Sequence, residues 1–523
     1  MTGARQFASR SEMQPAWAVR SQCYPKSETK MKSHKKHPQK RASIGSEDTI
    51  HSLKPNRFLH VLSVFLLALL GAIWVSPARS QEPGTPIVLN TVWRDNLGTD
   101  LRMSTNNSTE RDAHTIEGSV YYFANTNITG TTLMYRLFSS PDHMDSDVAG
   151  EGGYTTEGGI GYPWNSQLTG MVQVHRGYDS NSHHALISSN ETLSGYTLEG
   201  FTLYAYPRYG DGTPTSTSPT HNLSLTAGGI TIASNAVAGG AVWSLQWNGE
   251  EFINSHDYGR LLQTALNTDP GFDTNSTTYP GSPVSTNPTE AGASGYIGGT
   301  MYHDGSPCIS LSNSGNTQTS SCVPLDFAPK DWSGTNDIEP VIWQGLTLGK
   351  SVTLNYGSLG AVAKYVTQIN LPVSLSTGST YLPNTPQVFI PSLYLRSSFD
   401  TYYTYDPSTS TLTSLTIPSL GTATGVSLSS GQMAIIAKDS STSNCLALYV
   451  VSTASGGSAS GLGLFNFNDG SGTGASSNAC YQIYADYHGA FSSGSSSYDS
   501  YIACGTLSNV ESEINSLYTA GDK

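Results

Sequence analysis

The chain has 523 residues, of which 12% are charged and 10% are aromatic, and it contains 53 glycines. Soluble proteins have about 25% charged residues on average, so charge is sparse here. The composition excludes helical bundles, which need many Ala, Glu, Lys and Leu residues, and disordered chains, which lack aromatic side chains; it is typical of secreted β proteins.

The charge is divided unevenly along the chain. Residues 1–57 carry 12 Lys and Arg against 4 Asp and Glu, whereas the part after Arg79 carries 13 against 35. Binding to a phosphate backbone needs clustered Lys and Arg, which the acidic part lacks. The basic region could be read as a nucleic-acid arm, but its position before an apolar segment favours the flank of a signal peptide. We therefore expect no nucleic-acid partner.

Residues 58–80 form an apolar segment between a basic flank and a small-residue end. This pattern predicts a secretory signal peptide, so the basic region 1–57 is expected to be absent from the mature protein. The protein is then secreted or periplasmic. If the segment is not cleaved, its length is near the lower limit for crossing a bilayer, and it becomes a single membrane anchor.

Three repeats follow within residues 84–208. They share a dipeptide ending in Arg, a Glu-Gly dipeptide and a Tyr five residues after the Glu, at a period of about 40 residues. The members are Trp93-Arg94, Tyr135-Arg136 and His175-Arg176; Glu117, Glu157 and Glu199; and Tyr122, Tyr162 and Tyr204. The Arg and Glu side chains form either a ligand-binding set or structural ion pairs. Each repeat contains sequence patterns typical of β-strands, which predicts closed threefold packing of β units, a β-trefoil-like module.

Residues 87–208 resemble a secreted bacterial three-repeat domain of unknown function. The matching positions are Asp142-His143, Gly153-Tyr154 and Gly195-Tyr196, whereas Asp100-Leu101 and His183-His184 depart from the Asp-His pattern of that family. The resemblance implies an accessory module of an exported enzyme or of a cell-surface protein.

A linker rich in Gly, Pro, Ser and Thr is predicted at 209–222, followed by a second domain at 223–518. Runs that alternate with period two, such as 241–247 and 363–369, predict antiparallel strands. Their number predicts a large antiparallel β-sandwich, so the fold class is all-β throughout. One helix is expected near the end, capped by Ser508 and burying Val510, Ile514 and Leu517.

The second domain begins with the segment of the chain that is richest in closely spaced polar residues. A strand, an Asn248-Gly249 turn and a returning strand lead into a polar segment and two loops. The pattern GGAVWSLQWNGEEFIN, then GRLLQ, then NPTEAG resembles the galactose-mutarotase-like β-supersandwich over about residues 223–518. Sugar epimerases and domains of glycoside hydrolases and polysaccharide lyases share that fold, so the resemblance implies a carbohydrate ligand.

The candidate site residues lie in this polar segment and its loops. Those predicted to be catalytic are Glu290, His303 and Asp257, and those predicted to bind substrate are Arg260, Gln263, His256 and Asp304. Carboxylates, amides and Arg bind sugar hydroxyls in forked hydrogen bonds, and a carboxyl or His can act as acid or base. The alternatives are an Asp257–Arg260 pair within a turn, structural histidines, and a Glu290 that braces its loop. His488 is a further, isolated candidate.

Six cysteines are present, and Cys23 precedes the signal segment. Cys308 and Cys322 bracket a short polar segment and are predicted to form a local disulfide. The pairing of Cys445, Cys480 and Cys504 stays open. No Cys/His spacing is typical of zinc, so neither a metal nor a cofactor is expected.

Two functions follow from these patterns. The first is a secreted protein that binds or processes a polysaccharide or glycan through its second domain, and an enzymatic version would be a glycoside hydrolase, a polysaccharide lyase or an epimerase-like enzyme. The second is a non-catalytic cell-surface, adhesion or cell-wall-associated protein of two β domains.

Overall fold

The computed structural model describes residues 86–98, 101–106, 115–189, 193–208, 222–267, 287–297, 300–327, 340–375, 387–428, 431–451, 453–454, 457–472, 474 and 477–522. The predicted signal segment at 58–80 and nearly all of the predicted linker at 209–222 lie outside these ranges, so both stay predictions. Within these ranges, no helix is both long enough and apolar enough to span a bilayer.

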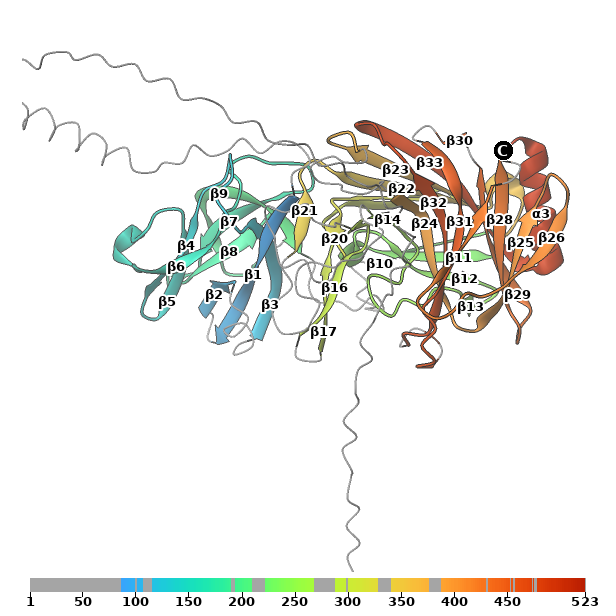
Figure 1. The fold of residues 1–523 in the computed structure, drawn as a ribbon. Coiled ribbons are helices and arrows are strands. Elements are labelled where there is room, and N and C mark those ends of the chain that lie inside the picture. Colours follow the sequence, from blue (N-terminus) through green and yellow to red (C-terminus); the bar gives the residue numbers. More distant parts are fainter. Residues whose placement is uncertain are drawn as a thin grey trace, which may run out of the picture. The chain divides into compact units, whose positions relative to one another are not determined.

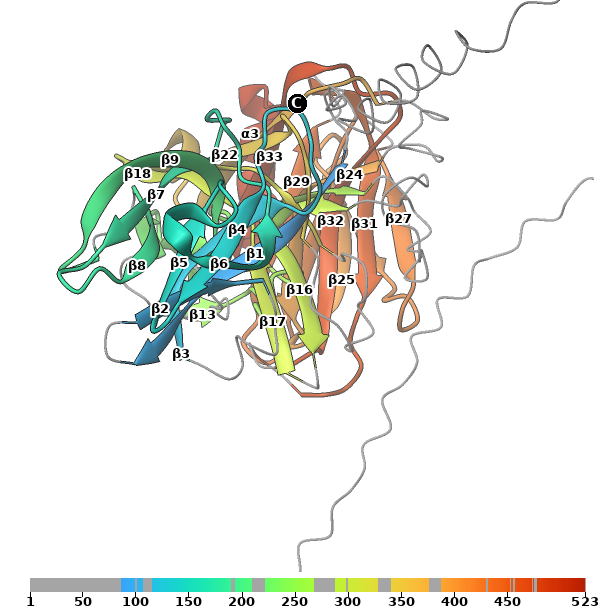
Figure 2. The same ribbon diagram turned by 90° about the vertical axis from the view of Figure 1, so that its left-hand side faces the viewer.

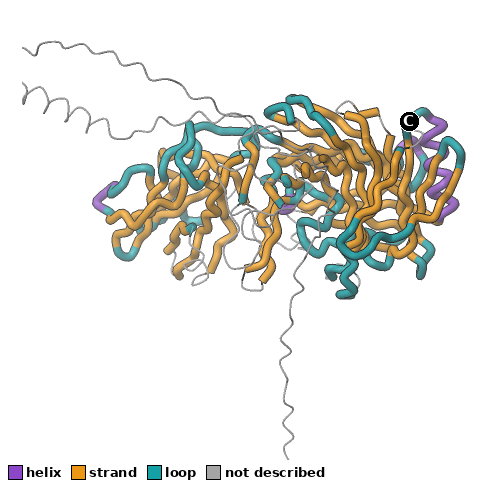
Figure 3. The backbone as a smooth tube through the Cα atoms, in the orientation of Figure 1, coloured by secondary structure: helices purple, strands orange, loops and turns teal. Residues whose placement is uncertain are grey.

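Strands dominate the described residues, as the sequence predicted (Figure 3). The three repeats contain β1 (Pro86–Gly98), β2 (Leu101–Thr105), β3 (Thr115–Ala124), β4 (Met134–Ser139), β5 (Asp142–Ser146), the 3-10 helix η1 (Glu151–Gly153), β6 (Thr155–Gly161), β7 (Val172–Tyr178), β8 (His184–Ser188) and β9 (Thr197–Arg208).

The middle of the chain is also made of strands and short turns. Its elements are β10 (Asn222–Ala227), β11 (Ile230–Asn235), η2 (Ala236–Ala238), β12 (Val242–Trp247), β13 (Glu250–Glu251), β14 (Gln263–Asn267), β15 (Pro288–Thr289), β16 (Gly292–Ile297), β17 (Thr300–Gly305), β18 (Cys308–Ser314), β19 (Thr317–Cys322), β20 (Leu325–Asp326), β21 (Val341–Trp343), β22 (Thr347–Leu354), η3 (Tyr356–Ser358) and β23 (Val362–Leu371).

The last part ends in an α-helix. Its elements are β24 (Gln387–Arg396), β25 (Phe399–Asp406), β26 (Thr411–Leu415), β27 (Ala423–Ser427), β28 (Gln432–Asp439), β29 (Asn444–Val451), β30 (Thr453–Ala454), β31 (Gly457–Asn466), β32 (Cys480–His488), β33 (Gly494–Thr506) and α3 (Leu507–Ala520).

The three repeats have the same local topology. In each repeat the first strand pairs with both of the others, giving the orders β2-β1-β3, β5-β4-β6 and β8-β7-β9. The second strands β2, β5 and β8 contact one another. Apolar side chains from all three repeats share one cluster, which includes Val92, Met134 and Val174. The trefoil-like classification stays a prediction.

Two antiparallel sheets form the sandwich of the larger part (Figure 1). One has the order β18-β19-β22-β23-β33-β29-β28-β25-β26, and the other runs from β27 through β31, β32, β24, β14, β15 and β20 to β21. β21 also pairs with β1 of the repeats. The main core lies between the two sheets, with side chains such as Leu448 and Ile502 from one and Leu393 and Ile483 from the other. This architecture confirms the predicted all-β sandwich.

The hairpin that opens the larger part follows its sequence closely. Asn248 and Gly249 both have positive φ, 50° and 81°, as a tight two-residue turn between β12 and β13 requires. Gly and Asn adopt this backbone conformation at low cost, which is why the dipeptide is a strong hairpin signal.

The helix α3 covers the outer side of the nine-stranded sheet. Val510, Ile514 and Leu517 are fully buried in a second apolar cluster between helix and sheet, as predicted from their spacing. The predicted cap was wrong by two residues: Thr506, not Ser508, is the N-cap, and its hydroxyl accepts the Asn509 amide. The helix begins earlier because β33 leads into it at Thr506 without an intervening loop.

This cap is testable by a pair of substitutions. Thr506→Ala is expected to lower the free energy of unfolding by about 1 kcal/mol, because it removes the acceptor for a helix N–H group. Ser508→Ala, within the first helical turn, should change it by less than about 0.5 kcal/mol. Urea unfolding followed by circular dichroism measures both, and the reverse ranking would restore Ser508 as the cap.

Candidate functional site

Glu290, predicted to be catalytic, lies in a buried ion pair. It follows β15, and its Oε1 accepts a hydrogen bond from Nζ of Lys350 in β22, while its Oε2 accepts one from the Thr264 amide at 3.3 Å. The side chains of Glu290 and Lys350 are only 4% and 1% exposed, and Lys350 also donates to the Gly240 carbonyl. Both carboxyl oxygens therefore have internal partners.

The backbone is closely packed beside this pair. A Cβ at Gly239, which has φ of 61°, would collide with the Glu290 carbonyl oxygen, and a Cβ at Gly305 would collide with the Val237 carbonyl oxygen. The Gly-Gly dipeptide that opens the predicted sugar-site pattern thus allows close packing against the Glu290 backbone.

Asp257 and Arg260 pair with each other, which is one of the alternatives that the sequence left open. Arg260 Nη1 donates to Asp257 Oδ2 within a turn. Burial disfavours the charged guanidinium, but Asp257 together with Cys480 and Tyr394 outweighs burial and raises the pKa of Arg260. Tyr394 and Cys480 lie near the same guanidinium.

Gln263 is held by backbone groups on both sides. Its Nε2 donates to the Tyr258 carbonyl at 2.8 Å, and its Oε1 accepts the Ala291 amide at 3.0 Å. Its side chain is 2% exposed. It therefore ties the Asp257–Arg260 turn to the segment after Glu290.

The remaining predicted residues are spread over neighbouring segments. His256 is half-buried beside Asn254, whose Oδ1 accepts the His256 amide at 3.2 Å. Asp304 is buried in β17, and His303 pairs with Ser294 in the β16–β17 ladder. The His303 side chain lies outside the described residues. The catalytic and binding roles of these residues stay predictions.

The predicted Cys308–Cys322 disulfide is absent from the structure. The two residues oppose each other in the β18–β19 ladder, but both are free thiols. A register shift between Cys308 and Ser310 changes the direction of the strand there. Cys308 Sγ donates to the Ser310 carbonyl at 3.4 Å, and Cys322 Sγ to the Glu290 carbonyl at 3.6 Å. Cys445, Cys480 and Cys504 are also free and buried.

A set of residues that the sequence did not single out lies on the side of the second sheet away from the core. β24, β32, β31 and β27 lie side by side (Figure 2). Successive strand residues alternate between faces, and Leu393, Ile483 and Leu464 point into the core. Their neighbours Tyr394, Gln482 and Phe465 therefore share the opposite face, which we call the outer face. These three are side by side in the strand register.

Aromatic rings gather at one end of the outer face. Phe467 lies 4.2 Å from Phe465 and 5.7 Å from Tyr394, centroid to centroid, and all three side chains are half-buried. Because Tyr394 lies near Arg260, the predicted Asp257–Arg260 pair borders these rings. The run Phe465-Asn466-Phe467 was the available sequence signal, since aromatic residues at alternate positions share one face of a strand.

Polar side chains continue along the same face. Gln482 donates to Ser392 at 2.7 Å, and Gln263 opposes Ser392 in the strand register. Further along β32, His488 Nε2 lies 2.5 Å from Asp486 Oδ2. His488 is 42% exposed. Gln482 and Gln263 are buried and have partners within the chain, whereas His488 is exposed.

The Arg and Glu that recur at the same spacing in the repeats form ion pairs in the second and third repeats. Arg136 pairs with Glu157 at 2.7 Å, and Arg176 pairs with Glu199. Arg176 also donates to Glu151 of the preceding repeat, at 2.8 Å and 3.0 Å. These contacts favour the structural interpretation of the two pairs.

Buried polar contacts also join one repeat to the next. Arg94 donates to the Leu186 carbonyl at 2.8 Å, joining repeats one and three. Ser104 donates to Asp145 Oδ2 at 2.6 Å, joining repeats one and two. His184 Nδ1 lies 2.6 Å from Asp142 Oδ2, joining repeats two and three. The three repeats therefore interlock through polar side chains as well as through their apolar cluster.

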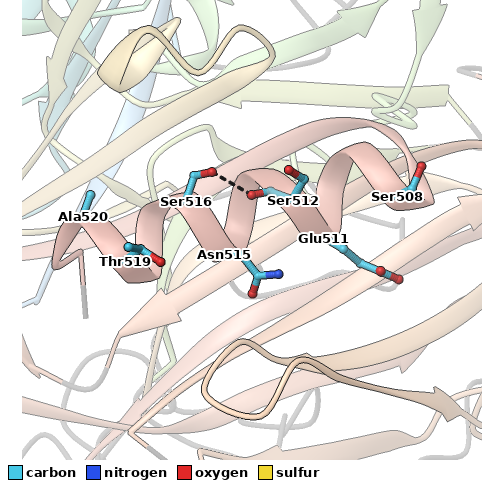
Figure 4. Close-up of a pocket in the computed structure, with 7 residues that line it drawn as sticks. All are labelled: Ser508, Glu511, Ser512, Asn515, Ser516, Thr519 and Ala520. Atoms are coloured by element: carbon cyan, nitrogen blue, oxygen red, sulfur yellow. Dashed lines mark hydrogen bonds between the residues drawn. The ribbon is translucent and has the colours of Figure 1, made fainter.

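The polar face of α3 lines a shallow depression (Figure 4). Its lining consists of Ser508, Glu511, Ser512, Asn515, Ser516, Thr519 and Ala520. All seven come from a single helix, so no second wall encloses a ligand. Among the described residues, no group of His, Cys, Asp and Glu side chains could hold a metal ion.

No protein-family model and no curated protein matches the chain. Solved structures similar to it include the Slr1438 protein from Synechocystis sp. PCC 6803, at 10% identity and a TM-score of 0.28 over 55% of this chain and 96% of that one. A galactose mutarotase-like protein from Clostridium acetobutylicum is 9% identical, with a TM-score of 0.28 over 55% and 95%. The 4-alpha-glucanotransferase from Thermococcus litoralis is 8% identical, with 0.27 over 55% and 37%. Similarities with identities and TM-scores this low support no inference about activity.

The interlocked repeats lead to a pH prediction. Burial raises the pKa of Asp145 to about 6, although Ser104, Arg136 and Arg176 favour its charged form and Asp142 opposes it. A raised carboxyl pKa stabilises the fold at low pH, and this contribution is lost as the pH rises through about 6. Asp145→Asn is therefore expected to raise the free energy of unfolding at pH 8. The difference between variant and wild type should be smaller at pH 4.5 than at pH 8, by about 2 kcal/mol. Urea titrations at the two pH values measure the difference; an equal effect at both would contradict the assignment.

Proposed function

We propose that this protein binds a neutral glycan on the outer face of its sandwich, at the rings of Phe465, Phe467 and Tyr394. The observation that carries the proposal is the cluster of three half-buried rings on one sheet face. Aromatic rings pack against the CH surface of a sugar. A protein core would instead bury such rings among aliphatic side chains.

The charges near the rings favour a neutral ligand. Arg260 pairs with Asp257, and Arg396 donates to the Ile253 carbonyl at 3.2 Å. Both cations are therefore already engaged by the protein, whereas an anionic polysaccharide would need basic groups available for its carboxylates.

The proposal assigns binding rather than catalysis. Glu290 and Asp257, two of the residues predicted to be catalytic, are each held by a basic side chain of the same chain. A glycosidase needs two carboxyl groups on either side of one bond, with one of them protonated. We propose in addition that the protein acts outside the cytoplasm, as the predicted signal segment implies.

A glycan array followed by titration calorimetry tests the proposal. The Phe465→Ala/Phe467→Ala double variant is expected to bind the selected neutral glycan at least about tenfold more weakly, a loss of about 1.4 kcal/mol, because the stacking surface is gone. Tyr178→Ala is the matched control, since this tyrosine is 39% exposed on β7 of the repeats, outside the outer face.

Two outcomes would overturn the proposal. One is an array on which no neutral glycan binds, which would leave the adhesion function as the alternative. The other is equal affinity of the double variant and the Tyr178→Ala control, which would place the glycan elsewhere.

A further inference from the structure

Glu290 and Lys350 lie at a buried position, where placing two charges costs free energy. Both residues are at least nine-tenths buried between the two sheets, at 3% and 4% exposure. Taking two charges out of water is costly even when they pair. Transfer of one proton from the ammonium to the carboxylate would leave an amine nitrogen held against a carboxylic acid.

We propose that Glu290 and Lys350 join in an intramolecular amide bond between Lys350 Nζ and Glu290 Cδ. The neutral amine attacks the carboxyl carbon, and a C–N bond forms. The C–O bond to one carboxyl oxygen then breaks, and that oxygen leaves as water with the acid proton and one amine proton. The step needs no oxidant, reductant or cofactor, and it replaces two buried charges with one neutral amide.

The surroundings hold the two reacting groups in place. The Thr264 amide donates to Glu290 Oε2, and the Gly240 carbonyl accepts from Lys350 Nζ, so each group has a second hydrogen-bond partner. Tyr365 lies beside the carboxyl; burial, and then the charge of Glu290, raise the pKa of this tyrosine. Its hydroxyl therefore keeps its proton and can relay the amine proton: it passes its own proton to the departing oxygen, takes up the proton of the amine and ends unchanged.

The bond would join the two sheets of the sandwich. Glu290 follows β15 of one sheet, Lys350 lies in β22 of the other, and 60 residues separate them in sequence. A covalent link of this span restricts the unfolded chain, as a disulfide does, but a reducing environment cannot break it. This inference is independent of the proposed glycan binding.

Peptide mapping of the purified, reduced and denatured full chain tests the proposal. Trypsin should fail to cleave after Lys350, because its amine is acylated, and should yield residues 261–330 linked to 331–364. This branched peptide is expected to be lighter by one water molecule than its two linear parts together. Fragmentation should place the link between positions 290 and 350.

Lys350→Arg is the control, because a guanidinium keeps the charge but does not form this amide. Its map should show full cleavage after position 350 and no loss of water. Cleavage after Lys350 in the wild-type chain, with residues 261–330 recovered at their sequence mass, would overturn the proposal whether or not the variant folds.

Discussion

The buried contact between Glu290 and Lys350 is the constraint on which the larger part of the molecule depends. It connects the two sheets in a mainly apolar core, and it also engages Thr264 and the Gly240 carbonyl. A buried charge is stable only with a partner in good geometry, so the surrounding backbone must hold both groups in position. The close approach of Gly239 to the Glu290 carbonyl follows from this requirement.

One sheet has structural contacts on one face and the proposed glycan site on the other. Its inner face packs Leu393 and Ile483 into the core, whereas its outer face presents Tyr394 and Phe465. The alternation of strand residues makes this division unavoidable once the core face is fixed. Glu290 belongs to the contact between the two sheets, and the proposed glycan site lies at the aromatic rings on the other face.

Local patterns predicted much of the fold. Period-two alternation located β12 and β23, the Asn248-Gly249 turn located its hairpin, and the spacing of Val510, Ile514 and Leu517 gave the buried face of α3. The site was harder to predict from the sequence, because its contacts join segments that are far apart along the chain. Nothing near Glu290 in the sequence indicates Lys350, whose position is set by strand register. The Asp257–Arg260 pair was foreseen as an alternative because both residues lie in one turn.

The central claim is that Glu290 is a structural partner of Lys350 and not an exposed catalytic carboxylate. A double-mutant cycle on unfolding tests it most directly. Glu290→Leu and Lys350→Leu are each predicted to lower the free energy of unfolding by about 3–5 kcal/mol, because each leaves a buried partner alone, and the double variant should lose less than their sum. Single variants that each cost less than about 0.5 kcal/mol, as exposed side chains do, would contradict the account.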